Sequence, residues 1–335
     1  MSRPKFDKDD YFKIDVETHL SGDKTHIDYY PGVQQWWKGV DGTRRAFGAA
    51  EKRKVSKIRD GEKKEEIPEE DKLITYMDRY GVDMACVLPE SMMETTGYST
   101  QWSSNGLVFA ACEKYPDRFI FQCNVGPLLK RGMKHALWEL EYLVKEKNCK
   151  LVKFYPPEDT YINNKEIWPF YEKISELGVP VTIHTGFSWC PPGRAKYCVP
   201  ILLDEVATDF PDLDIIAFHA GWPYCHDLNM VALTHPNVYI SLSLLMPWWF
   251  NAPYRLAKII GEAIQFAGDD KIIWGSDFFG AGGLIRLSVQ AMREFEMPDE
   301  LQEKYGYAPV TKEIKQKIFG ENLAKLLKID TKRKI

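Results

Sequence analysis

The chain lacks several features that would assign it to other protein classes. Its 335 residues contain no run of about 18 apolar residues, and the charged segment MSRPKFDKDD at the start has no apolar core of the kind found in signal peptides. The 44 basic and 48 acidic residues are intermixed, so no polycationic surface indicates a nucleic-acid partner. We therefore expect a cytosolic (cytoplasmic) protein that binds a small molecule, with no nucleic-acid or membrane partner.

The cysteines also exclude certain structures. None of them forms a CxxC pair, which argues against a disulfide framework and against a thiolate zinc site. Buried free thiols are the expected state. The seven residues are Cys86, Cys112, Cys123, Cys149, Cys190, Cys198 and Cys225.

Short apolar runs that end in polar or glycine residues recur eight times, and segments with helical periodicity separate them. This alternation is typical of a parallel sheet with crossover helices, so we predict an α/β fold, a (β/α)8 TIM barrel forming one domain over residues 13–328 with tails at 1–12 and 329–335. An open doubly wound sheet is the alternative, although its usual glycine-rich phosphate turn is missing. The expected strands span residues 13–20, 83–90, 119–127, 149–157, 179–186, 213–221, 238–245 and 271–279.

One connection is unusually long. We interpret residues 21–72 as an insertion folded over the barrel mouth, because the loop after a strand lies on the catalytic face of such barrels. The charge-dense stretch at 51–72 is equally typical of a solvated loop or an exposed helix. Trp36 and Trp37 could pack on substrate or on a neighbouring subunit, and residues 294–309 could also form a dimer contact.

Ionisable residues lie at the ends of several expected strands. Glu17 and His19 are two positions apart on the first strand, so their side chains leave the same face. His184, His219 and Asp277 end the fifth, sixth and eighth strands. A single histidine in such a strand is more often a core residue, but burying two carboxylates and three histidines together without a cation is costly. The set therefore predicts one divalent metal ion, and its oxygen and nitrogen donors suit Zn or Mn.

These segments resemble the amidohydrolase superfamily, in particular its decarboxylases of aminocarboxymuconate semialdehyde and of hydroxybenzoic acids. Glu17-x-His19, VTIHTG around His184, FHAG around His219 and WGSD around Asp277 match that branch in order and approximate spacing. MDRYGVD at 77–83 and FGENLAKLL at 319–327 extend the resemblance over residues 13–328.

The resemblance implies a site at the matching positions. Glu17, His19, His184 and Asp277 would bind the metal, and His219 would be a catalytic or carboxylate-binding residue that is not a ligand. As a separate mechanistic hypothesis, we expect Asp277 also to act as the general acid. Trp222 departs from the glutamate that several hydroxybenzoate decarboxylases carry there, which leaves the substrate open.

Lys153 lies where binuclear amidohydrolases carry a carboxylated lysine. We interpret it as an ordinary residue, because the Glu17-x-His19 opening is closer to the mononuclear branch.

Aromatic and basic residues follow the same strand ends. Each aromatic residue alone is more often barrel packing, but as a group they favour a flat aromatic ligand held by stacking. Arg194 and Arg255 could pair with a substrate carboxylate, although surface salt bridges are the default for both. The expected substrate contacts are Phe187, Trp222, Tyr224, Trp248 and Phe278, and Trp189 and Trp249 lie nearby in the sequence.

The predicted function is therefore a metal-dependent decarboxylase of a small aromatic or cyclic carboxylic acid. The alternative is a hydrolase or hydratase acting on an amide, a lactone or a cyclic substrate, with Asp277 as general base. A third possibility is a barrel without catalytic activity that serves as a binding protein. The resemblance also implies a homodimer.

Overall fold

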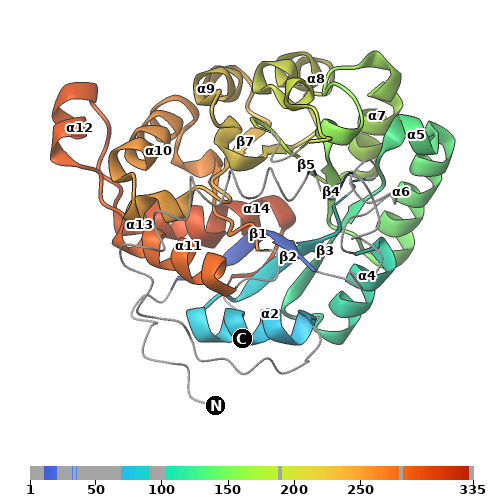
Figure 1. Ribbon diagram of the computed structural model, residues 1–335, viewed down its shortest axis with the longest axis horizontal. Helices are drawn as coiled ribbons and strands as arrows, with labels where there is room; N and C mark the ends of the chain where they lie inside the picture. The colour runs from blue at the N-terminus through green and yellow to red at the C-terminus, as the bar shows by residue number, and fades with distance from the viewer. Residues whose placement is uncertain are drawn as a thin grey trace.

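The strands of the protein form one closed parallel barrel in the computed structural model, which describes residues 11–20, 32, 35, 69–90, 92, 103–187, 191–278 and 282–331. Each strand pairs in parallel with the next, from β1 to β8. The amide of His19 donates to the carbonyl of Phe278 at 2.6 Å, which joins β1 to the segment after β8 and closes the ring. The predicted (β/α)8 TIM barrel is confirmed (Figure 1). The strands are β1 (Ile14–His19), β2 (Met84–Leu88), β3 (Phe119–Asn124), β4 (Leu151–Phe154), β5 (Val181–Ile183), β6 (Ile215–Ala217), β7 (Val238–Ser241) and β8 (Ile272–Ile273).

Helices surround the barrel on its outside (Figure 1). Two of them end next to residues that stop helices: α7 stops before Gly178, whose φ of 66° ends the helix, and α8 stops two residues before Pro211. The described helices are α2 (Glu69–Tyr80), α4 (Asn105–Lys114), α5 (Leu128–Arg131), α6 (Met133–Lys147), α7 (Trp168–Leu177), α8 (Leu203–Asp209), α9 (Cys225–Thr234), α10 (Pro253–Ala267), α11 (Gly282–Glu294), α12 (Asp299–Tyr305), α13 (Lys312–Gln316) and α14 (Asn322–Leu327).

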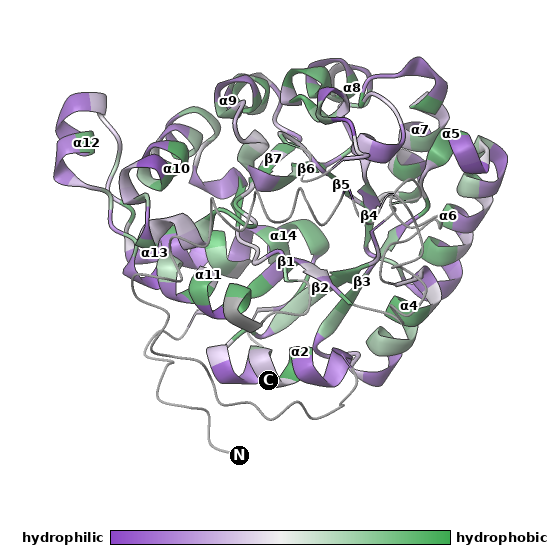
Figure 2. Ribbon diagram, in the orientation of Figure 1, coloured by the Kyte–Doolittle hydropathy of each residue, from purple (hydrophilic) through white to green (hydrophobic). Residues whose placement is uncertain are grey.

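Side chains alternate between two apolar clusters along the strands. On β4, Val152 and Phe154 belong to the large cluster between barrel and helices, whereas Leu151 belongs to a small cluster inside the barrel. Both faces are therefore covered, which explains the nearly continuous apolar runs in the sequence. Hydrophobic residues accordingly gather on the strands and on the inner sides of the helices (Figure 2).

The inner cluster forms the floor of the barrel. Leu323 and Ala324 of α14 pack there against Ile14, Leu151 and Ile273. The segment before α14 lies so close to the first strand that a Cβ on Gly320 would come within 2.3 Å of the Phe12 carbonyl oxygen. Glycine is needed at that position because the two backbones touch.

Other predictions are tested only in part. Most of the predicted insertion at 21–72, including Trp36 and Trp37, lies outside the described residues, and Glu69–Lys72 already form the first turn of α2. Tyr11, placed in the N-terminal tail by the sequence, is buried and packs 6.0 Å from the Phe319 ring.

Two further findings concern the chain as described. Every cysteine except Cys190, which lies outside the described residues, is free and buried. No helix among the described residues is long and apolar enough to cross a membrane.

Candidate metal centre

A β-bulge in β1 turns the first two site residues into the barrel. Asp15 pairs with Ala85 and Thr18 with Val87, so β1 has one residue more than β2 over this stretch. Such an extra residue shifts the alternation of the side chains. It lets Val16 join the floor cluster while Glu17 and His19 still contact the polar centre.

Asp15 holds this bulge in place. Its Oδ1 accepts hydrogen bonds from the amide of Glu17 at 3.2 Å and from the amide of Ser276 at 2.8 Å. The carboxyl thus joins β1 to the segment that carries Asp277. Burial raises the pKa of Asp15 to about 7.

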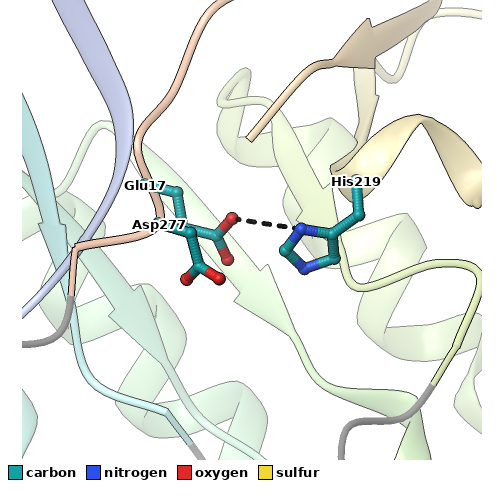
Figure 3. Close-up of side chains that lie close together, drawn as sticks. All are labelled: Glu17, His219 and Asp277. Atoms are coloured by element: carbon teal, nitrogen blue, oxygen red, sulfur yellow. Dashed lines mark ion pairs between the residues drawn. The ribbon is translucent and has the colours of Figure 1, made fainter. Parts of the chain in front are cut away.

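Glu17, His19, His219 and Asp277 lie close together at the C-terminal ends of the strands. His19 Nε2 is 3.6 Å from Glu17 Oε1 and 3.3 Å from Asp277 Oδ1, and His219 Nδ1 is 3.8 Å from Glu17 Oε2. Figure 3 shows His219 and the two carboxylates gathered at one point. Glu17, His219 and Asp277 offer ligand atoms that all lie within 4.8 Å of one another, as a metal ion requires.

The two histidines that follow β5 and β6 lie at different distances from the carboxylates. His184 Nε2 donates to the carbonyl of Phe187 at 2.9 Å, and its Nδ1 lies 3.1 Å from His219 Nε2. His219 therefore lies between His184 and the carboxylates. The structure places His219 in the donor group, whereas His184, the predicted ligand, contacts it from behind. Ring orientation, which the sequence does not specify, makes this difference.

Unusual backbone angles accompany these residues. His219 has φ of 62°, Ala220 has 46° and Asp277 has 56°, all in the left-handed region that residues other than glycine rarely adopt. Such strain is typical of functional sites, where the surrounding structure holds it. After β6 and after β8, the turn directs the side chains of His219 and Asp277 towards β1.

Lys153 and Glu90 complete the cluster. The Lys153 ammonium is fully buried, 2.9 Å from Glu17 Oε1 and 3.4 Å from Glu90 Oε2. Asn124 Nδ2 donates to Glu90 at 3.3 Å. Lys153 is therefore part of the cluster, and its interpretation as a lysine that carries no carboxyl group stays a prediction. Glu90 was missed, although it ends an expected strand just as the other site residues do.

The charges of these groups are strongly coupled. Burial alone would raise the pKa of Glu17, but Lys153 and His219 lower it well below the usual value. Burial would lower the pKa of His19, but the hydrogen bonds that its ring donates to Asp277 and Glu17 raise it to about 10. Burial raises the pKa of Glu90 and, together with His219, lowers that of His184 well below its usual value.

The residues fit a divalent cation. Glu17 Oε2 and His19 Nδ1 are buried and have no hydrogen-bond partner among the described residues. Three carboxylates, those of Glu17, Glu90 and Asp277, face one ammonium group in the same buried volume. A bound cation would supply the missing partner and the missing positive charge.

A cluster of aromatic rings begins next to the paired histidines. The Trp222 ring lies edge-on to Phe187 at 5.2 Å and to Trp248 at 5.0 Å, and the Arg255 guanidinium lies 5.4 Å from the Trp248 ring centre. Trp222 directly follows the FHAG turn, and its amide donates to the carbonyl of His219. These four predicted substrate contacts thus lie together beside the site.

The other predicted contacts are placed differently. The Phe278 ring is fully buried and packs 6.0 Å from Tyr76 of α2, outside the barrel, so the structure favours a packing role. Tyr224 and Arg194 are exposed, and Trp249 packs on Phe295. Trp189 lies outside the described residues.

Tyr155 was not singled out by the sequence analysis. Its buried ring lies 5.1 Å from the His184 ring, edge-on, at the end of β4. The alternation of side chains along β4 is the signal that could have placed Tyr155 and Lys153 on the same inner face.

Sequence comparison matches nearly the whole described barrel to one protein family. Residues 14–329 match the family described as amidohydrolase. Among curated proteins, protein fluG of Emericella nidulans is 23% identical over 105 residues, which cover 31% of this chain and 12% of that protein. The matched segment is thus a small part of that relative.

Several solved structures share the fold. An uncharacterized TIM-barrel protein from Bordetella bronchiseptica is 18% identical, with a TM-score of 0.64, and the match covers 96% of this chain and 99% of the other. A 2,6-dihydroxybenzoate decarboxylase solved with 2,6-dihydroxybenzoate is 17% identical (TM-score 0.61, coverage 95% and 99%).

Two further matches differ in chemistry. A 5-carboxyvanillate decarboxylase from Novosphingobium aromaticivorans, complexed with manganese, is 17% identical (TM-score 0.60, coverage 96% and 97%). A 4-oxalomesaconate hydratase from Rhodopseudomonas palustris is 16% identical (TM-score 0.57, coverage 95% and 96%).

Proposed function

Because the chain belongs to the amidohydrolase family, we propose that it is a metal-dependent enzyme that removes the carboxyl group, without oxidation, from a small aromatic or cyclic carboxylic acid. The observation that carries this proposal is that the Trp222 ring cluster begins next to His219, which belongs to one buried set with Glu17 and Asp277. A flat ring with an acidic group would contact both. The decarboxylases among proteins of similar fold support the same reaction.

The metal would be one Zn or Mn ion held by Glu17, His19, Asp277 and a second histidine, either His184, which the sequence predicts, or His219. His219 faces these carboxylates directly, and His184 contacts His219. The bound ion would act as a Lewis acid that polarises the substrate's carboxylate and a neighbouring oxygen.

The chain's own residues would bind the ring and move the proton. Asp277 would pass a proton to the ring carbon that bears the carboxylate. The bond between that carbon and the carboxyl carbon then breaks, and CO2 leaves. The electron pair of the broken bond remains with the ring carbon, where it forms the new C–H bond with the proton. The half-buried ring of Trp222 would hold the substrate by its face, and Arg255, which lies over the buried Trp248 ring, would pair with an acidic group.

Hydration or hydrolysis is the second candidate. The hydrogen-bonded pair of His184 and His219 could pass a proton to or from an attacking water molecule, with Asp277 as general base. The hydratase of similar fold supports this alternative.

A substrate screen distinguishes the two candidates. Protein loaded with Mn²⁺ or Zn²⁺ would be mixed with ortho-hydroxylated benzoic acids, and with lactones and unsaturated dicarboxylic acids. We expect CO2 release from a member of the first group, abolished by a chelator and restored by the metal. Addition of water to the second group without CO2 release would contradict the decarboxylase proposal and favour the alternative.

Assembly and location remain predictions. The helix α12 stands away from the barrel in Figure 1, within the segment 294–309 that the sequence suggests for a dimer contact. A homodimer in the cytosol is expected, and a mass measurement in solution tests the first part.

A further inference from the structure

Lys153 is the one buried ammonium group in the described part of the metal centre. Its Nζ forms ion pairs with Glu17 at 2.9 Å and with Glu90 at 3.4 Å, and it lies 4.1 Å from the centre of the Phe218 ring. Carboxylates on one side and an aromatic face on the other surround it, which is the environment a cation prefers.

The same carboxylates belong to a second group of possible ligands. Glu17, His19 and Glu90 offer atoms within 4.8 Å of one another, just as Glu17, His219 and Asp277 do. The two groups share Glu17. Judged by donor atoms alone, the centre could hold two ions bridged by one carboxylate.

The net charge of the buried site opposes the binding of two metal ions. With His19 in the neutral form that a metal ligand requires, the three carboxylates carry three negative charges, and the Lys153 ammonium neutralises one of them. One divalent ion neutralises the remaining two, so a second would leave a net positive charge of two in a buried site, which is expensive. The lysine and a second metal ion would also compete for the carboxylates of Glu17 and Glu90.

A carboxylated Lys153 does not fit these contacts. Forming the carbamate requires a neutral amine whose lone pair attacks CO2, and the product is an anion. An amine between two carboxylates is held as the ammonium form, and a carbamate there would add a fourth negative charge beside Glu17 and Glu90.

We propose that Lys153 is a built-in second cation, which fills the Glu17 and Glu90 side of the centre and limits it to one divalent metal ion. Asn124 supports this arrangement by fixing Glu90 at 3.3 Å. The proposal rests on the metal dependence of the proposed function and assigns Lys153 a role in metal number rather than in the reaction.

Metal counting tests the proposal. Wild-type protein and variants would be dialysed against Mn²⁺ or Zn²⁺ alone, and bound metal would be measured by elemental analysis. We expect one ion in the wild type and two in Lys153→Met, which keeps the length of the side chain but removes its charge. The double variant Lys153→Met/Glu90→Gln should return to one ion, because the second ligand group is lost. Lys145→Met, at an exposed lysine paired with Glu141, is the matched control and should bind one.

Specific outcomes would overturn the proposal. Two ions in the wild type, or one ion in a folded Lys153→Met variant, would contradict it while leaving the metal-dependent function intact. No ion in the wild type would remove both. If Lys153→Met does not fold, the wild-type protein kept in bicarbonate provides the test. We expect mass spectrometry to show no carboxyl adduct on Lys153 and elemental analysis still to show one ion. An adduct together with two ions would show that the lysine is a bridging ligand.

Discussion

The floor and the mouth of the barrel are built from the same strands with opposite chemistry. On β4, Leu151 belongs to the apolar floor, and Lys153, two residues on, is the buried cation of the metal centre. The floor needs only side chains of suitable volume, whereas the mouth needs particular donors and charges at particular places. The difference indicates that stability depends mainly on the floor and activity mainly on the mouth.

Asp277→Asn should separate the two regions most strongly. The amide keeps the size of the side chain but removes the acid and a ligand charge, so we expect kcat to fall about 10³-fold. The melting temperature should change little because no floor contact is altered. Steady-state kinetics and thermal unfolding measure both quantities, with Asp299→Asn on exposed α12 as control. Near-normal turnover in Asp277→Asn would refute its role.

Leu323→Ala should give the opposite result. Leu323 is 1% exposed in the floor, and its loss leaves a cavity, so the free energy of unfolding should fall by about 2–5 kcal/mol. Activity below the unfolding transition should persist, as urea titration and kinetics at low temperature can show. A large loss of kcat in the folded variant would mean that floor and mouth are not separable.

Gly320→Ala tests the contact that seals the floor. The new Cβ would lie 2.3 Å from the Phe12 carbonyl oxygen, so we expect about 1–3 kcal/mol of destabilisation. Gly106→Ala in α4 is the matched control: its nearest neighbour would be 3.7 Å away, and removing a helical glycine should be neutral or stabilising. Equal effects in urea unfolding would contradict the close contact at Gly320.

Trp222→Ala sharpens the comparison within the mouth. The ring is half-buried against Phe187 and Trp248, so its removal should weaken substrate stacking by about 1 kcal/mol and raise KM several-fold. The bound metal should be unchanged because the ligands stay in place. Loss of metal on elemental analysis would assign Trp222 to the centre itself rather than to substrate binding.

The smallest expected effect is on the reactivity of the buried cysteine thiols. Burial raises the pKa of Cys112, Cys198 and Cys225 to about 12, so they should stay protonated and resist alkylation in native protein at pH 8. Because the folded pKa lies above the usual 9, the protonated state stabilises the fold fully below pH 9 and less as the pH rises towards 12. Mass spectrometry after iodoacetamide treatment tests this, with unfolded protein as the reactive control. Rapid labelling of these three in native protein would contradict their burial.

The sequence predicted the barrel well, because strand runs and helix ends such as Gly178 depend on local pattern. The cluster of Glu17, His19 and Asp277 at strand ends was also predictable. The bulge in β1 was not, since it arises from pairing with β2. Ring orientation likewise decides which of the two histidines faces the carboxylates.

The alternation of side chains along a strand could have predicted which way Phe278 and Lys153 face. Asp277 faces inward, so its neighbour Phe278 must face the helices, as it does. Lys153 lies two residues from Leu151 and therefore shares its inward face. Its partner Glu90 depends on a contact between non-adjacent strands, which local pattern does not encode.

The link between Asp15 and Ser276 joins residues 261 positions apart. A ribosome adds about 5–20 residues per second, so the first strand emerges roughly 13–50 s before the segment that completes its site. Throughout that interval Glu17 and His19 have no Asp277 beside them. The complete donor set therefore exists only near the end of synthesis or after release, so loading of the proposed metal ion would be a late step in the life of each molecule.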